Sequence, residues 1–159
     1  MGKNADTPVL IAGGGPVGMT LALELASHGI RSILVERNAG TTRHPKMDLT
    51  NGRSMELFRR LGMADRLRAA GVAEDQALDI TWATRATGHH LHTFHYPCPA
   101  EWRRQVRAAN DGSCTVEPPM RVSQVVLEPV LKDAIDANPL VDVRFGWAFE
   151  SFTQDADGV

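Results

Sequence analysis

The residues of this chain that point most clearly to chemistry are three glycines and one carboxylate near its N-terminus. Gly13, Gly15 and Gly18 follow a short apolar run, and Glu36 ends a second one. Glycines at the start of a helix expose backbone N–H groups, and the positive end of the helix dipole adds to their attraction for phosphate. A carboxylate after the next strand can accept hydrogen bonds from both ribose hydroxyls and would repel a 2′-phosphate. The spacing predicts a dinucleotide site that takes an unphosphorylated adenosine ribose.

Three elements must position these residues. The sequence predicts a buried strand at 9–11, a helix that begins near Pro16 and ends at Gly29, and a second strand at 30–35. Four apolar residues recur at helical spacing in that helix: Met19, Ala22, Leu23 and Ala26. In such a βαβ unit the first glycine allows the tight turn, the second admits a pyrophosphate to the backbone, and the third lets the helix lie close to the sheet. An ordinary glycine-rich turn in an α/β protein is the alternative interpretation.

The composition is typical of a globular protein. The 159 residues are 43% hydrophobic and 23% charged with a formal net charge of −2, so the overall charge favours neither nucleic acid nor an anionic membrane. No apolar run is long enough to cross a bilayer, and residues 1–8 lack the apolar core of a secretory signal. Cys98 and Cys114 lack metal-type spacing, and two free thiols fit a reducing compartment. We therefore expect a cytoplasmic protein.

The rest of the chain is predicted to alternate helices with strands. In order, we expect a polar surface segment at 37–48, helices at 50–61 and 64–70, a β-hairpin within 78–96, a loop at 97–119, a helix from an N-cap at Ser123 to Ala137, and a strand at 141–149. The sequence after that strand, at 154–158, is a turn signal that predicts a returning strand. Because no such strand follows, we expect the chain to be the first part of a longer polypeptide.

Two other clusters are not expected to be functional sites. His89, His90, His92 and His95 alternate between the two faces of a strand and have no acid or cysteine at ligand spacing, so a metal site is not predicted. The arginines near Trp102 lie beside acidic residues, which favours a solvated loop over a nucleic-acid surface.

Three blocks of sequence together resemble the single-component FAD-dependent aromatic hydroxylases, in the branch similar to phenol hydroxylases. The blocks are the glycine turn with Glu36-Arg37, residues 45–57 (PKMDLTNGRSMEL) and residues 121–131 (RVSQVVLEPVL). The resemblance implies a Rossmann-like α/β FAD-binding domain with the beginning of an inserted β-sheet substrate domain. It implies the following division: 1–77 as the first part of the FAD-binding domain, 78–119 as the start of the substrate domain, and 120–159 as the return to the FAD-binding domain.

The same resemblance implies which residues hold FAD. The cofactor-binding residues would be Gly13, Gly15, Pro16, Val17 and Gly18 at the pyrophosphate, Glu36 at the ribose, Arg37 near the adenine, Lys46 and Met47 in the second block, and Gln124 at the flavin. The family usually has Pro-Arg-Ala where this chain has Pro45-Lys46-Met47. Lys46 can neutralise a phosphate as a point charge, but it lacks the bidentate fork of arginine. Without the resemblance, Gln124 is also compatible with a solvated residue in the first turn of a helix.

The resemblance further implies hydroxylation of a phenolic or related aromatic substrate with NAD(P)H and O2, through a flavin C4a-hydroperoxide that an electron-rich ring attacks. Asp48 would be the catalytic residue, because a base that takes or orients the phenol proton makes the ring more nucleophilic. Alternatively, Asp48 caps the helix at 50–61. Arg53 could approach the flavin or substrate, or pair with an acid as a structural residue.

Two other functions stay open at this point. The chain could be part of an NAD-dependent dehydrogenase, or a non-catalytic module that binds a nucleotide. A homodimer is compatible with the sequence, which does not indicate the oligomeric state. Because the family's later motifs are absent, we expect the 159 residues alone to be inactive.

Overall fold

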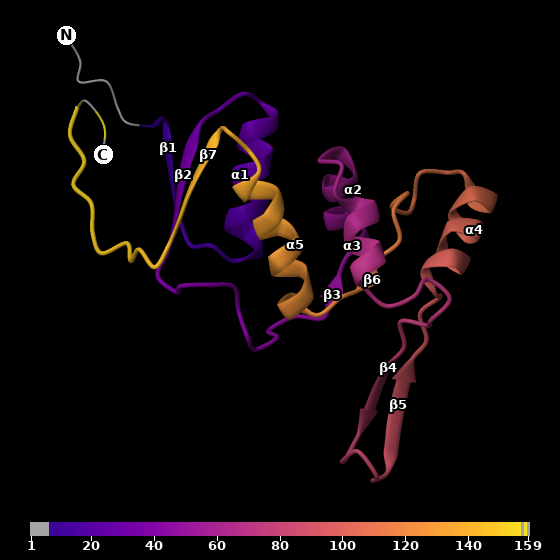
Figure 1. Cartoon of the computed structure of the whole chain (residues 1–159). Helices are drawn as coiled ribbons and strands as arrows, with labels where there is room; N and C mark the ends of the chain where they lie inside the picture. Colours follow the sequence, from indigo (N-terminus) through magenta and orange to yellow (C-terminus); the bar gives the residue numbers. More distant parts are fainter. Residues whose placement is uncertain (1–6, 157, 159) are drawn as a thin grey trace. The chain divides into compact units, whose positions relative to one another are not determined.

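The computed structural model describes residues 7–156 and 158 of the chain. These residues form two compact units, one made of the chain up to Pro45 together with the chain from Gln124 onward, and the other made of residues 46–123. Figure 1 labels the helices and strands along the sequence.

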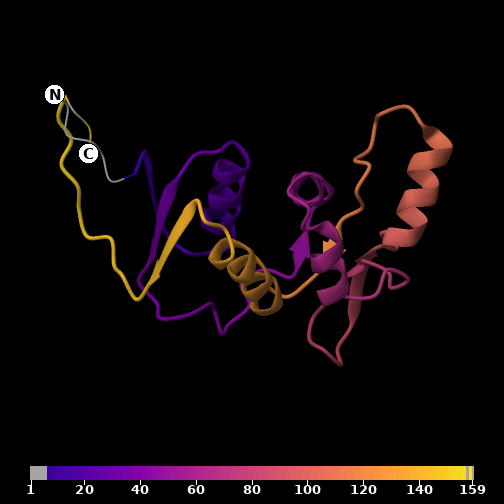
Figure 2. The ribbon, with the colours of Figure 1, turned by 45° about the horizontal axis from the view of Figure 1, so that its top comes forward.

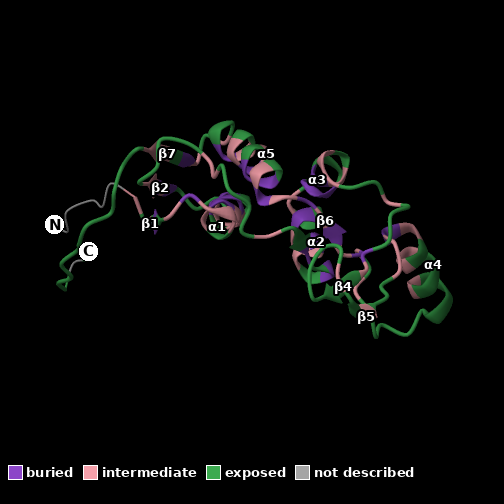
Figure 3. Ribbon diagram, turned by 90° about the horizontal axis from the view of Figure 1, so that it is seen from below, coloured by how far each residue is buried: buried purple, intermediate pink, exposed green. Residues whose placement is uncertain are grey.

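The first unit is built on a parallel sheet of three strands. β1 (Val9–Ala12), β2 (Ser32–Glu36) and β7 (Val141–Phe145) lie in the order β1-β2-β7, with β2 hydrogen-bonded to both neighbours. Two helices, α1 (Pro16–Ser27) and α5 (Gln124–Asp136), pack against each other and on one face of this sheet, as Figure 3 shows. Connections of this kind place the ends of β1 and β2 beside each other at one edge of the sheet.

The buried residues of this unit follow the predicted helical spacing. The four apolar residues expected to face the sheet from α1 are all buried: Met19, Ala22, Leu23 and Ala26. The elements that α1 contacts, β2 and α5, also bury apolar residues: Leu34 of β2, and Leu127, Leu131 and Ile135 of α5. The predicted end of α1 is also confirmed, because Gly29 follows the C-cap residue and has a φ of 74°.

The last strand is shorter than the sequence predicts. Alternating apolar residues suggested a strand over 141–149, but β7 ends at Phe145. Gly146 has a φ of 81°, which breaks the extended conformation. Trp147 and Phe149, which continued the alternation, lie beyond the strand and are exposed. The turn signal at 154–158 contains Asp157, which lies outside the described residues, as do residues 1–6 at the other end.

The second unit contains three helices and two small antiparallel sheets. Its elements are β3 (Leu49–Thr50), α2 (Gly52–Arg60), α3 (Ala64–Ala70), β4 (Ile80–Ala83), β5 (His90–Phe94), α4 (Pro99–Ala109) and β6 (Met120–Arg121). β3 pairs with β6, and β4 pairs with β5 as the predicted hairpin, which Figure 2 shows in a second view. The predicted bounds of α3 are confirmed, and the helix expected from about residue 50 begins at Gly52 after the short strand β3.

The loop predicted at 97–119 is wrong, because α4 occupies its first half. Pro99 stands in the first turn, where its missing N–H has no helical partner to lose, and Glu101 lies near the positive end of the helix dipole. Asn110 ends the helix in the left-handed conformation with a φ of 45°. The prolines on both sides of the helix suggested a loop, although these local signals favoured a helix.

Among the described residues, the structure contains no helix that is both long enough and apolar enough to span a membrane.

Candidate functional site

The turn between β1 and α1 depends on Gly13 and Gly15. Gly13 has a φ of 123°, a conformation that side chains disfavour, and its N–H donates to the backbone oxygen of Val35 at 2.8 Å. Gly15 is the N-cap residue of α1 and has no side chain that could cap the helix. Pro16 has no N–H, and Val17 in the first turn is 84% exposed. The start of the helix is thus left open to an external hydrogen-bond acceptor.

The glycines of this turn divide into two that face open space and two that are packed. A Cβ atom added to Gly13 or Gly15 would meet nothing within 4 Å. A Cβ added to Gly18 would lie 2.0 Å from the backbone oxygen of Gly13, and one added to Gly14 would lie 2.7 Å from the Cβ of Glu36. Gly18 therefore allows α1 to approach the turn, whereas Gly15 leaves the backbone accessible from outside.

The carboxylate of Glu36 lies beside this turn and is held by the backbone. Its Oε2 accepts a hydrogen bond from the Gly14 N–H at 2.8 Å, and its Oε1 accepts from the Asn38 N–H at 2.9 Å and from Asn38 Nδ2 at 2.6 Å. Burial alone would raise the pKa of Glu36, but the hydrogen bonds from Asn38 and Gly14, with the charge of Arg37, lower it below its ordinary value. Glu36 is therefore ionised at neutral pH and fixed in position.

These features fit the adenosine diphosphate part of a dinucleotide. The open helix start can bind phosphate oxygens, and the open space at Gly15 lets them approach the backbone. Oε2 of Glu36 accepts one protein hydrogen bond, so it keeps the capacity to accept another from a ribose hydroxyl. Arg37 is exposed next to this carboxylate.

Gln124 lies in the same unit and is buried, so the alternative of a solvated first-turn residue is wrong. Its Nε2 donates to Oε1 of Glu128 at 2.6 Å within α5. The other oxygen of Glu128, Oε2, accepts from the backbone N–H of Thr42 at 2.6 Å. This carboxylate, which is only 3% exposed, therefore joins α5 to the segment that follows β2.

Asp48 belongs to the second unit, as do Lys46 and Met47 just before it. Its Oδ2 accepts from Arg121 Nη1 at 2.7 Å, and its backbone oxygen accepts from the Val122 N–H at 2.8 Å. The alternative that Asp48 caps the following helix is wrong, because the N-cap residue of α2 is Asn51, whose side chain accepts from the Ser54 N–H at 2.8 Å. Lys46 is exposed and Met47 is half-buried.

The second unit also contains an apolar pocket with a volume of about 540 Å³. Its lining includes two aromatic side chains, Tyr96 and Trp102, and three aliphatic ones, Leu49, Leu78 and Ile80. Arg53 contributes to the lining, and its guanidinium pairs with Glu56 at 3.3 Å on the same helix. The size and the apolar lining are typical of sites for small organic ligands.

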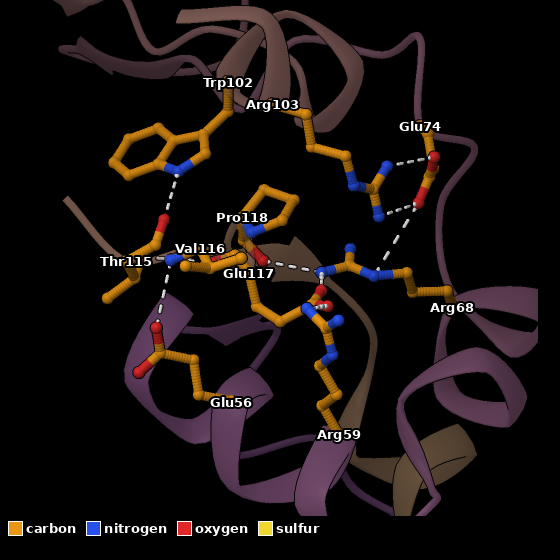
Figure 4. Close-up of polar contacts among 10 residues, drawn as sticks. All are labelled: Glu56, Arg59, Arg68, Glu74, Trp102, Arg103, Thr115, Val116, Glu117 and Pro118. Carbon is orange, nitrogen blue, oxygen red and sulfur yellow. Dashed lines mark hydrogen bonds and ion pairs between the residues drawn. The ribbon is translucent and has the colours of Figure 1, made fainter. Parts of the chain in front are cut away.

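Residues 113–115 line this pocket and belong to a strap, residues 113–118, that polar contacts hold in place (Figure 4). The indole N–H of Trp102 donates to the Thr115 oxygen at 3.1 Å, and Glu56 accepts from the Val116 N–H at 3.0 Å. Glu117 pairs with Arg68 at 2.7 Å and with Arg59 at 3.3 Å. These contacts determine the shape of the pocket wall before any ligand binds.

A second carboxylate, Glu74, adds further ion pairs next to the strap. Arg103 of α4 makes two hydrogen bonds to Glu74, at 2.5 and 2.8 Å, and Arg68 lies 3.7 Å from the same carboxylate. The hydrogen bonds and charge of Arg103, with the charge of Arg68, lower the pKa of Glu74 although burial raises it. The arginine that sequence analysis placed on a solvated loop is thus a structural residue of a helix.

Among the described residues, no group of three or more His, Cys, Asp or Glu side chains could hold a metal ion. The histidines of the hairpin make separate contacts instead. His95 lies 2.9 Å from Asp79, and His90 lies 2.8 Å from the hydroxyl of Thr93.

Sequence reasoning missed four residues that fix the candidate site residues. Gly14 and Asn38 hold Glu36, Glu128 holds Gln124, and Arg121 holds Asp48. Asn38 could have been found, because an Asn two residues after a strand end often bonds locally. Glu128 and Arg121 lie inside the third sequence block, but nothing local indicates that they contact Thr42 and Asp48.

A family model described as an FAD binding domain matches residues 6–159. The FAD-dependent monooxygenase apdD of Emericella nidulans is 45% identical over 95% of this chain and 24% of its own length. The phenol 2-monooxygenase of a Pseudomonas species is 30% identical over 97% of this chain and 24% of its own length.

Two solved structures of flavin-dependent enzymes are also similar to this chain. A ternary complex of aklavinone-11 hydroxylase with FAD and aklavinone matches 98% of this chain and 28% of the hydroxylase, with a TM-score of 0.79 and 29% identity. The rebeccamycin biosynthetic enzyme RebC with reduced flavin matches 94% of this chain and 27% of that enzyme, with a TM-score of 0.74 and 37% identity. The chain thus spans about a quarter of the length of the curated relatives it matches.

Proposed function

The chain belongs to the FAD binding domain family, and from that premise we propose that it supplies the ADP-binding part of an FAD-dependent monooxygenase that hydroxylates an aromatic compound. The observation that carries this proposal is the pairing of an open, glycine-lined helix start with a fixed carboxylate at the end of the next strand. Two of the similar proteins, a phenol 2-monooxygenase and an aklavinone-11 hydroxylase, have names that state an aromatic substrate, which supports this proposal.

In this proposal the residues of the first unit divide the cofactor between them. The turn at Gly13–Gly18, with Pro16 and Val17 in its helix start, binds the pyrophosphate through backbone N–H groups. Glu36 accepts hydrogen bonds from the ribose, and Arg37 lies near the adenine. Gln124 contacts the flavin end from the start of α5.

The second unit contributes further cofactor contacts and the start of the substrate domain. Lys46 places a positive charge toward a phosphate, and Met47 contacts the cofactor beside it. The hairpin formed by β4 and β5 provides the first strands of the substrate-domain sheet, and the apolar pocket at Tyr96 and Trp102 binds part of the aromatic substrate.

The bound flavin, reduced by NAD(P)H, supplies the activation of O2 for the transfer of one oxygen atom to the ring. Asp48 accepts or orients the proton of the substrate hydroxyl at its carboxylate, which makes the ring a better nucleophile. Arg121 holds that carboxylate at 2.7 Å and therefore sets its direction. The pocket excludes water from the ring because most of its lining is apolar.

The test is the visible absorption spectrum of the full-length protein that carries this chain, purified and incubated with FAD. We expect a bound flavin spectrum that NAD(P)H bleaches faster when a phenolic compound is present, and a hydroxylated product. An Asp48→Asn variant should bind FAD as tightly and lose roughly 100-fold or more in hydroxylation rate. A colourless protein that binds NAD and oxidises a substrate without O2 would replace this proposal with a dehydrogenase.

A further inference from the structure

We propose that Glu128 is a positioning residue of the cofactor site, which fixes the orientation of the Gln124 amide and ties it to the segment after β2. This inference rests on the proposed contact of Gln124 with FAD. Sequence reasoning assigned no role to Glu128, and the structure reveals it through two short hydrogen bonds.

The contact is buried on both sides. Glu128 is 3% exposed and Gln124 is 7% exposed, so water does not compete for their polar atoms. The two residues stand four positions apart on α5, which places their side chains on one face of the helix. Gln124 Nε2 donates to Glu128 Oε1 at 2.6 Å.

A carboxylate at this place determines which end of the amide it meets. An ionised carboxylate only accepts hydrogen bonds, whereas an amide has a donor end and an acceptor end. Glu128 therefore holds the NH2 end of Gln124, and the carbonyl end of the amide faces the opposite way. The polarity that Gln124 presents to a ligand is thus decided by Glu128.

The second carboxylate oxygen of Glu128 binds the segment that follows β2. Oε2 accepts from the backbone N–H of Thr42 at 2.6 Å, across 86 positions of sequence. Thr42 lies in the segment between Glu36, which is proposed to bind the ribose, and Pro45, the last residue of the first unit before the chain enters the second. One side chain consequently holds two segments that carry proposed cofactor residues.

The carboxylate of Glu128 is buried at a position where packing alone would favour an apolar side chain. Burying a carboxylate costs free energy unless hydrogen bonds compensate for the lost water, and an apolar residue of similar volume often packs as well. Neighbouring positions of α5 that face the core, Leu127 and Leu131, are apolar. Glu128 therefore fits a requirement for a fixed polar contact.

Glu128→Gln in the full-length protein isolates this role. The new side chain has the same shape, and its amide oxygen can still accept from the Thr42 N–H. Its amide nitrogen would then face the Gln124 nitrogen, so the Gln124 amide must turn over to offer its oxygen instead. We expect the FAD dissociation constant to rise about tenfold, with a shifted visible spectrum of the bound flavin and an unfolding midpoint of the apoprotein close to that of wild type.

Two further variants separate positioning from structural support. In a Gln124→Ala background, Glu128→Gln should cause no additional change in FAD affinity, because its effect passes through Gln124. Asp136→Asn removes another carboxylate of α5, one that pairs with Lys132 at the surface, and should leave the affinity unchanged.

These measurements distinguish a failure of the cofactor proposal from a failure of the inference about Glu128. If wild-type protein binds no FAD, the cofactor proposal and this inference are both wrong. If wild type binds FAD and Glu128→Gln binds it equally well, only this inference is wrong. The inference also fails if Glu128→Gln weakens binding to the same extent with and without Gln124, because the carboxylate would then act independently of the amide.

Discussion

The backbone N–H of Gly14 donates to Oε2 of Glu36 at 2.8 Å, which joins the turn after β1 to the carboxylate at the end of β2. The contact needs a glycine, because a Cβ on Gly14 would lie 2.7 Å from the Cβ of Glu36. The proposed phosphate-binding turn and the proposed ribose-binding carboxylate are thus one assembly that exists before the cofactor binds. Such preorganisation reduces the ordering cost of binding.

The pKa of Glu36 predicts how this assembly responds to acid. Its folded-state pKa lies below the ordinary value of 4.5, so its stabilising contribution is complete above about 4.5 and is lost as the pH falls through the folded pKa. Glu36→Gln should therefore be less stable than wild type at neutral pH, and the difference should shrink as the pH falls below about 4.5. Urea unfolding at a series of pH values measures this, and a difference that does not change with pH would contradict it.

A pair of alanine variants distinguishes the two kinds of glycine in the turn. Gly18→Ala places a Cβ 2.0 Å from the Gly13 oxygen, so it should destabilise the protein by about 1–3 kcal/mol. Gly15→Ala places its Cβ in open space, so the free energy of unfolding should stay within about 0.5 kcal/mol of wild type while FAD affinity falls. Chemical unfolding and FAD titration of both variants give the comparison. Equal effects of both changes on stability would argue against the open approach at Gly15.

The capping residue of α2 can be separated from Asp48 by mutation. Asn51→Ala removes the side chain that accepts from the Ser54 N–H and should cost about 1 kcal/mol in the free energy of unfolding. Asp48→Asn leaves this cap in place and affects only an exposed contact with Arg121, so its cost should stay within about 0.5 kcal/mol. Thermal unfolding of the two variants measures the difference, and a larger loss for Asp48→Asn would restore the capping role for that residue.

The ion pair between Arg68 and Glu117 of the strap should contribute far more to stability than a surface pair. Arg68 and Glu117 have side chains that are 9% and 12% exposed, so Glu117→Gln removes the nearer charge partner of a buried guanidinium and leaves only the more distant Glu74, at 3.7 Å. We expect a loss of about 3 kcal/mol or more in the free energy of unfolding. The control is Lys132→Met at the exposed pair with Asp136, which should cost less than about 1 kcal/mol. Comparable losses in urea unfolding would mean that the strap is not held by this pair.

Much of the first unit could be predicted because its signals are local. The spacing of Met19, Ala22, Leu23 and Ala26 fixes which face of α1 is buried, and the glycines on either side of the helix mark its ends. The same kind of signal existed for α4, in Pro99, Glu101 and Asn110, and the prediction of a loop there was wrong because the surrounding prolines were given more weight.

The sequence by itself determined the βαβ unit, the glycine turn and the carboxylate at Glu36, since turn geometry and helix periodicity depend on residues a few positions apart. Only the tertiary structure decided which groups hold the candidate site. Strand β7 ends at Phe145, where alternation predicted four more residues. Asp48 contacts Arg121 across 73 positions of sequence, and Glu128 contacts Thr42 across 86. Contacts of this range depend on how α5 packs within the first unit and on how β3 pairs with β6 within the second, and no local pattern encodes either.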